Sequence, residues 1–272
     1  MKKLVALLLI VVLLMPCALA DQRANMEIYQ VENTMLFDFD FDGAEEAMEL
    51  TVDTDECGDG SFTLKVGENE CSVDDCCSLA DEVWVMHMGW DKLNCYGTLF
   101  LVPEYGMSDD PLTYCFYYVS GKLGYAGKMY ALPRNMKRTD VASITTSTRA
   151  SLVGTWSRPT DYVLAQRIAY DMDWDYMSEF YIAESPRDLY QMNMMVTLNM
   201  NLPLYRTRFD SMPTMALAPN QKVIFTATDD VTWVYVTNLE GTMGGWFRVN
   251  YRTVEVLNKD IDEVFSDIFY AD

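Results

Sequence analysis

Over much of this 272-residue chain, apolar side chains recur at every second position in runs of five to eight residues. The segments 48–52 and 62–66 are clear examples. A period of two places successive side chains on opposite faces of an extended strand, whereas a helix needs apolar residues three and four positions apart. Glycine, asparagine, aspartate or proline separates the runs, as turns between strands require. The pattern therefore predicts an all-β protein built from antiparallel sheets.

The same reasoning locates strands in two blocks of the chain. In the first block the predicted strands cover residues 48–52, 62–66, 83–88, 98–102, 113–119 and 123–130, with a tight turn at Ser120-Gly121. In the second block they cover residues 196–198, 203–206, 215–217, 222–228, 232–237 and 244–249. Five or six short strands within about 60 residues are typical of a small barrel. Helical spacing is clear only at the end, where one short amphipathic helix is predicted from Ile261, Val264, Phe265 and Ile268.

The first twenty residues have the pattern of a secretory signal peptide. Lys2 and Lys3 precede the apolar run Leu4–Met15, and the small residues Ala18 and Ala20 follow it. The run is shorter than the roughly 20 residues that cross a bilayer, so we expect no membrane span. We expect cleavage after Ala20 and a secreted, extracellular protein without a lipid anchor. The predicted organisation is a signal peptide at 1–20, a first β domain at 21–193, and a barrel with its C-terminal helix at 194–272.

Charge and histidine content exclude several classes of function. The formal net charge is −21 and becomes −23 once Lys2 and Lys3 are removed. An acidic surface of this strength repels phosphate groups, so nucleic acid is not an expected partner. The only histidine, His87, lies in an apolar segment, which indicates a packed side chain rather than a general base. We predict no catalytic residues, although the many carboxylates leave open a glycan-active enzyme that uses a carboxylate pair.

Six cysteines follow the predicted cleavage point: Cys57, Cys71, Cys76, Cys77, Cys95 and Cys115. An even number of cysteines in an exported chain predicts disulfide bonds. The sequence cannot choose among the possible pairings, except that adjacent cysteines are poorly placed to bond to each other. Free thiols and a metal cluster are the alternatives, and the Cys-x2-Cys pairs typical of zinc sites are missing.

An acidic segment, Asp38-Phe-Asp-Phe-Asp-Gly-Ala-Glu-Glu46, carries three alternating carboxylates followed by a glycine. Calcium prefers roughly six to eight oxygen ligands, and a tight loop of this kind can supply them. We predict a Ca²⁺ site whose ligands are the side chains of Asp38, Asp40, Asp42 and Glu46 and the carbonyl of Ala44. The alternative is a solvated acidic turn between a strand that ends at Phe37 and another that begins at Met48. Phe41 occupies a position where such loops usually carry glycine.

Residues 36–50, with the sequence LFDFDFDGAEEAMEL, resemble the D-x-D-x-D-G-x-x-[DE] element of FG-GAP/VCBS-type repeats. These repeats are propeller-blade-like β units of secreted and cell-surface proteins. The resemblance implies that the acidic loop joins two antiparallel strands and often holds calcium. The segment 99–129 resembles the downstream part of such a unit, but residues 88–97 offer few oxygen donors where a second acidic loop is expected. Two recognisable units are too few for a closed propeller, so a partial propeller-like arrangement is expected.

The second block resembles a bacterial SH3-like domain of the cell-envelope type. The resemblance rests on Leu202-Pro-Leu-Tyr205, Lys222–Asp229, Trp233-Val-Tyr-Val236 and Gly244-Gly-Trp-Phe247. Two or three aromatic residues must fill the interior of so small a barrel, and the others can stack on a sugar ring or a peptide. We predict that Trp233, Trp246 and Tyr235 bind a ligand.

These features together predict a secreted, non-catalytic binding or adhesion protein that acts at a cell envelope or another extracellular surface. Its expected partner is a cell-wall glycan or peptide, or a surface protein. A purely structural scaffold, in which calcium serves stability alone, is the remaining alternative. The sequence makes no prediction about the oligomeric state.

Overall fold

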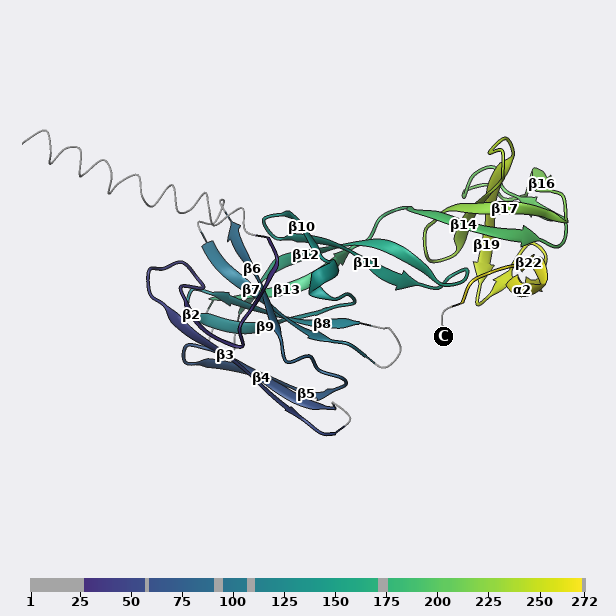
Figure 1. The fold of residues 1–272 in the computed structure, drawn as a ribbon. Helices are drawn as coiled ribbons and strands as arrows, with labels where there is room; N and C mark the ends of the chain where they lie inside the picture. The colour runs from purple at the N-terminus through teal and green to yellow at the C-terminus, as the bar shows by residue number, and fades with distance from the viewer. Residues whose placement is uncertain (1–26, 57–58, 91–94, 107–110, 171–175, 271–272) are drawn as a thin grey trace, which may run out of the picture. The chain divides into compact units, whose positions relative to one another are not determined.

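The computed structural model describes residues 27–56, 59–90, 95–106, 111–170 and 176–270 (Figure 1). In these residues the chain is nearly all β, with several antiparallel sheets and one short helix near the C-terminus, which confirms the predicted fold class. The predicted signal peptide, residues 1–20, lies outside the described residues. Among the helices of the described ranges, none has the length and hydrophobicity that crossing a membrane requires.

The chain divides into two compact units. The first consists of Met1–Thr146 and Asp161–Ser185, and the second of Ser147–Thr160 and Pro186–Asp272. Two strands, β11 (Ser143–Ala150) and β12 (Trp156–Tyr170), therefore contribute residues to both units. As a result, the second unit is assembled from two separate segments of the chain.

The first unit contains a four-stranded and a five-stranded antiparallel sheet. The four-stranded sheet follows the chain order, with β2 (Thr34–Phe37), β3 (Glu46–Thr54), β4 (Gly60–Val66) and β5 (Asn69–Cys76). The five-stranded sheet has the order β1-β6-β7-β8-β9, with β1 (Tyr29–Val31), β6 (Val83–Trp90), β7 (Cys95–Glu104), β8 (Leu112–Val119) and β9 (Lys122–Met129). Ser120 and Gly121 join β8 to β9 with φ angles of 50° and 73°, which confirms the predicted tight turn.

Hydrophobic side chains cover both faces of the five-stranded sheet. Tyr114 and Phe116 of β8 pack into one hydrophobic core together with Leu64 of β4. The intervening residue, Cys115, packs into a second core together with Leu164 of β12. Because both faces are buried, β8 is almost continuously apolar instead of alternating.

A further sheet has the order β10-β11-β12-β13, with β10 (Lys137–Asp140) and β13 (Tyr176–Ser185) at its edges and the 3₁₀ turn η1 (Pro133–Asn135) before it. The alternation of apolar residues did not predict these strands. The reason is visible on β11, where Thr146 and Thr148 occupy buried positions that an apolar residue normally takes. The Thr148 hydroxyl hydrogen-bonds the Thr160 hydroxyl at 2.7 Å, so polar side chains are satisfied inside the sheet.

The second unit is built on a seven-stranded sheet that curls into a half-barrel. Its order is β21-β20-β19-β18-β17-β14-β22, with β14 (Tyr190–Leu198), β17 (Gln221–Thr228), β18 (Trp233–Asn238), β19 (Gly244–Asn250), β20 (Thr253–Val254), β21 (Lys259–Asp260) and β22 (Phe265–Ser266). A two-stranded sheet of β15 (Leu202–Leu204) and β16 (Met215–Leu217) adds to the same unit. On β18 and β19, alternate residues such as Val234 and Phe247 enter the hydrophobic core, whereas Trp233 and Trp246 do not.

The predicted C-terminal helix exists but is shorter than the residue spacing indicates. Helix α2 covers only Ile261–Val264, and its first turn is capped by the Asp260 carboxylate, which accepts a hydrogen bond from the N–H of Asp262. Phe265 is extended and begins β22, where it pairs with Leu198 of β14. Ile261, Val264 and Phe265 are all buried in the core, so the amphipathic spacing correctly identified the buried face.

Candidate functional sites

The loop between β2 and β3 brings together the three aspartates that were predicted to bind calcium. One carboxylate oxygen from each of Asp38, Asp40 and Asp42 lies within 4.8 Å of the other two. Backbone groups orient the side chains, because the Gly43 N–H donates to Asp38 Oδ2 (3.1 Å) and the Ala44 N–H donates to Asp42 Oδ1 (2.7 Å). Among the described residues, this is the only group of three or more His, Cys, Asp or Glu side chains close enough to share a metal ion.

Two carboxylate oxygens of this loop are buried without a hydrogen-bond partner in the described part of the chain. They are Asp38 Oδ1 and Asp40 Oδ1, and the Asp40 side chain as a whole is buried, with 7% of the residue exposed. A buried polar atom without a partner is costly, and the cost is greater for a charged group. The donor set therefore fits a hard cation, whose bonds to oxygen would satisfy both atoms.

Asp40 and Glu46 tie the loop to neighbouring backbone. Asp40 Oδ2 accepts a hydrogen bond from the N–H of Gly121 at 2.6 Å, and Glu46 Oε2 accepts one from the N–H of Phe39 at 3.0 Å. Burial raises the pKa of Asp40; the hydrogen bond from Gly121 lowers it, and the negative charge of Asp42 raises it further. Burial likewise raises the pKa of Glu46, against the lowering effect of the Phe39 N–H. Ala44 is exposed, and the role of its carbonyl stays a prediction.

Phe41 lies at the loop position where glycine is usual, and its backbone conformation shows why glycine is favoured there. Its φ angle is 61°, in the left-handed region that strains a bulky side chain. Its ring packs against His87 at 5.1 Å and against Phe37 at 6.0 Å between ring centroids. These aromatic contacts offset the backbone strain, which a glycine would not incur.

The only histidine connects β1 to the acidic loop through buried hydrogen bonds. The Tyr29 hydroxyl lies 2.7 Å from His87 Nε2, and His87 Nδ1 lies 2.9 Å from Thr98 Oγ1. The Thr98 hydroxyl donates to the carbonyl of Phe39 at 2.7 Å. Because that proton is already used, Thr98 must accept from His87 Nδ1–H, and in the neutral imidazole Nε2 then accepts from Tyr29. His87 thus has the packed, hydrogen-bonded position that its apolar segment indicates.

The disulfide prediction is wrong for the four cysteines whose side chains are described. Cys71, Cys76, Cys77 and Cys115 are free thiols. Cys76 and Cys115 belong to different hydrophobic cores. Cys71 and Cys76 are five residues apart on β5, on the order of 15 Å for an extended strand, whereas a disulfide needs Cα atoms within about 7 Å. Cys57 and the side chain of Cys95 lie outside the described residues.

The three aromatic residues predicted to bind a ligand share one face of the half-barrel, on the side opposite to its core. Trp233 pairs across the strands with Arg248, and Tyr235 pairs with Trp246. The Tyr235 and Trp246 rings meet edge to face at 5.0 Å between centroids. Tyr205, which follows β15, hydrogen-bonds the backbone of Trp246 in both directions at 2.8 Å, and its ring is perpendicular to that of Trp233 at 5.4 Å between centroids.

A cavity of about 370 Å³ opens beside these aromatic residues, and we call it the Trp233 pocket. It is lined by Tyr205, Arg208, Asp210, Ser211, Trp233 and Arg248. Of the predicted ligand-binding residues, only Trp233 lines it. Trp246 lies beneath the Arg208 guanidinium, which is 5.4 Å from the indole centroid, and Tyr235 packs on Trp246.

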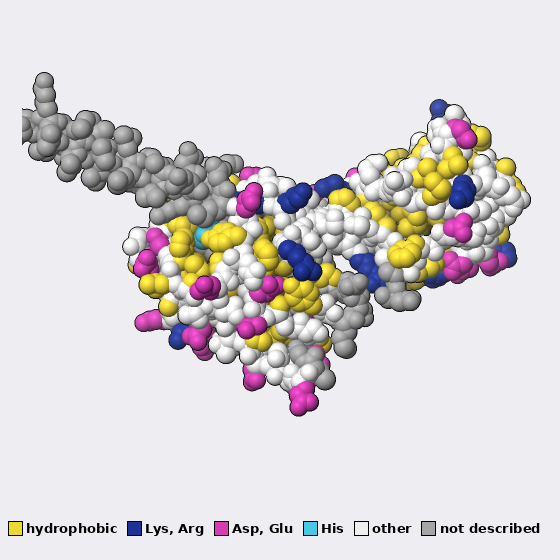
Figure 2. Space-filling model, in the orientation of Figure 1, with side chains coloured by type: hydrophobic (Ala, Val, Ile, Leu, Met, Phe, Trp, Pro, Cys, Tyr) yellow, Lys and Arg dark blue, Asp and Glu magenta, His cyan; other side chains and the backbone are white. Residues whose placement is uncertain are grey.

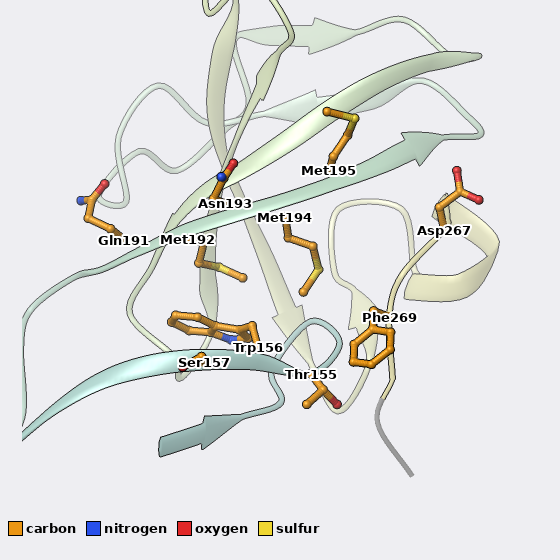
Figure 3. A pocket seen from close by; sticks show the side chains of 10 residues that line it. All are labelled: Thr155, Trp156, Ser157, Gln191, Met192, Asn193, Met194, Met195, Asp267 and Phe269. Atoms are coloured by element: carbon orange, nitrogen blue, oxygen red, sulfur yellow. The ribbon is translucent and has the colours of Figure 1, made fainter. Parts of the chain in front are cut away.

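A second cavity, of about 580 Å³, runs along β14 in the same unit (Figure 3). Figure 3 shows Met192 and Met194 projecting from β14 toward the segment Thr155–Ser157, whereas Met195 projects the other way. Trp156 and Phe269 complete apolar walls, and the buried Trp156 Nε1–H has no hydrogen-bond partner among the described residues. The chemistry of this cavity suits an apolar group, whereas the Trp233 pocket is mainly polar.

Arg208 and Arg248 were missed by the sequence analysis. Arg248 could have been found, because it lies two residues after Trp246 on the same strand and therefore on the same face. Arg208 lies in the loop between β15 and β16, where no periodicity predicts the direction of a side chain. On the face drawn in Figure 2, acidic side chains are scattered over both units rather than gathered in one patch.

Comparisons of the chain with protein-family models, with curated proteins and with solved structures found no match. The resemblance to FG-GAP/VCBS-type repeats and to SH3-like domains therefore stays a prediction.

Proposed function

We propose that this chain is a secreted, non-catalytic binding protein that acts at a cell envelope or extracellular surface, and that the Trp233 pocket is its ligand site. The observation that carries the proposal is the convergence of aromatic rings and guanidinium groups on one cavity of the second unit. Its volume of about 370 Å³ lies within the range of roughly 300–1,000 Å³ that is usual for ligand pockets.

The lining of the two cavities favours binding over glycosidic catalysis. Asp210 is the only carboxylate that lines the Trp233 pocket, and Asp267 is the only one that lines the cavity along β14. Both oxygens of Asp210 accept hydrogen bonds from Thr207, at 2.9 Å each. Hydrolysis of a glycosidic bond normally uses two facing carboxyl groups, which neither cavity supplies.

The ligand site is tested by screening the full chain against immobilised peptidoglycan fragments and surface glycans. Replacing Trp233 by alanine should weaken binding about tenfold or more, because the residue forms a wall of the cavity. Tyr251→Ala is the matched control, since Tyr251 is 96% exposed and lies outside the pocket. Absence of binding by the parent chain, or equal binding by Trp233→Ala with its fold intact by circular dichroism, would contradict the proposal.

We also propose that the acidic loop holds Ca²⁺ through Asp38, Asp40, Asp42 and Glu46, with the Ala44 carbonyl as a further ligand. The support is the pair of buried, unpartnered carboxylate oxygens within the aspartate cluster. Bound calcium would neutralise the clustered charge and cross-link the ends of β2 and β3. Its contribution here is structural, as a link between strands.

The calcium proposal is tested by thermal unfolding in CaCl₂ and in a chelator. Calcium should raise the midpoint, because a ligand that prefers the folded state stabilises it. Asp40→Asn should remove the shift, whereas Asp53→Asn, at an exposed position of β3, should retain it. Equal midpoints in calcium and in chelator for the parent chain would refute the site.

A further inference from the structure

The Trp233 pocket differs in charge from the chain that carries it. The chain has a net charge of −21, yet the lining of this pocket includes two guanidinium groups and a single carboxylate. That carboxylate, Asp210, is held by Thr207, and these hydrogen bonds lower its pKa. The pocket therefore concentrates hydrogen-bond donors on an acidic protein.

The Arg248 guanidinium lines the pocket and has one carboxylate partner in the described part of the chain. Its guanidinium stacks over Trp233 at 5.3 Å from the ring centroid, and one end makes an ion pair with Glu255 at 3.1 Å. Its Nε–H is buried and has no hydrogen-bond partner among the described residues. The side chain as a whole is 43% exposed, and its planar guanidinium can bind a second carboxylate in two parallel hydrogen bonds, so an oxyanion in the cavity suits it.

Arg208 approaches the pocket from the loop between β15 and β16. Its guanidinium stacks over Trp246, its Nη1 donates to the Asp188 carbonyl at 3.4 Å, and its main ion pair, 2.7 Å long, is with the Asp188 carboxylate, a side chain that is 81% exposed. The other nearby carboxylate, Asp229, is 3.9 Å away, and its Oδ1 already accepts three backbone N–H groups. Neither partner is a buried carboxylate that binds the Arg208 guanidinium through two parallel hydrogen bonds, and an exposed ion pair contributes little.

The remaining donors in the pocket suit a ligand rich in hydroxyl groups. Tyr205 and Ser211 both line the cavity, and each carries a hydroxyl group that can donate or accept a hydrogen bond. Asp210 retains lone pairs that can accept from a ligand hydroxyl. The pocket thus combines aromatic rings, neutral hydroxyls, one acceptor and two guanidinium groups. The rings and hydroxyls suit a sugar ring, and the guanidinium groups suit a carboxylate, so the set matches a sugar that bears a carboxylate better than a neutral sugar or a simple anion.

We propose that the Trp233 pocket binds an acidic sugar, a uronic acid residue of a glycan, with Arg248 and Arg208 holding its carboxylate. This inference rests on the proposed function and adds the chemical class of the ligand. It predicts discrimination between a carboxylate and its neutral ester on the same sugar.

The test is titration of the full chain with trigalacturonate, with its neutral methyl ester, and with a triglutamate peptide, followed by calorimetry and by backbone amide NMR. The acid trimer should bind about tenfold or more tightly than the ester, and amide shifts should centre on residues 205–211 and 233. Arg248→Gln should lower the affinity for the acid about tenfold and the affinity for the ester by a clearly smaller factor. Arg248→Lys, which keeps the charge and loses the fork, should give an intermediate value, and Lys222→Gln serves as a charge-matched control.

The outcomes separate this inference from the proposed function. If Trp233-dependent binding to a neutral glycan is found while the acid trimer binds no more tightly than the ester, the ligand class is overturned and the binding function stands. Triglutamate binding as tight as that of trigalacturonate would also overturn the assignment to a sugar. If no glycan or peptide binds the parent chain, both proposals fail.

Discussion

Replacing Thr98 by valine should destabilise the first unit far more than the same replacement on the surface. The Thr98 hydroxyl is fully buried, accepts from His87 and donates to the carbonyl of Phe39. Valine has nearly the same shape but removes both hydrogen bonds, so a buried carbonyl and a buried imidazole nitrogen lose their partner. Each orphaned group costs about 1–3 kcal/mol. His87 can limit its own loss by moving its proton to Nε2 and donating to Tyr29, which places the expected total near 2–4 kcal/mol.

The assay is urea denaturation followed by circular dichroism and tryptophan fluorescence, with the midpoint converted to free energy at constant slope. Thr63→Val is the matched control, because within the described residues the Thr63 hydroxyl bonds only the Ser72 hydroxyl, at an exposed position of the sheet. The control should change the free energy of unfolding by about 0.5 kcal/mol or less. The reasoning is refuted if Thr98→Val costs no more than Thr63→Val, because the buried chain of hydrogen bonds would then contribute nothing.

Three further predictions concern other parts of the molecule. Burial raises the pKa of Asp40 and Glu46 above their unfolded values, so in chelator their contribution to stability should be greatest below about pH 4 and be lost as the pH rises through the raised pKa values. In urea denaturation at a series of pH values, Asp40→Asn should therefore reduce the dependence of the free energy of unfolding on pH. The same pH dependence in the variant and the parent chain would contradict this prediction. Burial raises the pKa of the Cys115 thiol, so mass spectrometry should show no alkylation of Cys115 by iodoacetamide in the native protein and full alkylation in urea, whereas rapid native labelling would argue against its burial. Gly154→Ala should lower the free energy of unfolding by about 1–3 kcal/mol more than Gly241→Ala, as measured by thermal unfolding. Both residues have positive φ angles, but only at residue 154 would a Cβ meet Ile268 Cγ2 at 2.5 Å and the Phe269 carbonyl oxygen at 2.8 Å. Equal losses would show that the backbone around residue 154 rearranges to accept the methyl group.

The fold class could be predicted because alternation is a local property. The segment 62–66 lies within the strand β4, and its apolar members Phe62, Leu64 and Val66 are the ones that are buried. Alternation failed to predict strands whose buried positions are polar, as at Thr146 and Thr148 of β11. Their partners lie in other segments, so nothing in the neighbouring sequence identifies them as interior residues.

The acidic loop and the cysteines show the same difference between what a short stretch of sequence predicts and what depends on the tertiary structure. Asp38, Asp40 and Asp42 lie close together because alternation and a following glycine bring them onto one tight loop, which a short stretch of sequence contains in full. The separation of Cys76 from Cys115 depends on which face of each sheet the two residues occupy, and a count of cysteines carries no such information.

The amino-acid sequence by itself determined the strands with alternating side chains, the acidic loop, and the aromatic residues of the second block. Only the tertiary structure decided that Ser147–Thr160 joins the second unit and that Arg208 meets Arg248 at one pocket. The physical reason is range: periodicity records which face of a strand is buried, over a few residues. A pocket depends on strand register and on the path of a loop, through which residues forty positions apart come to line the same cavity.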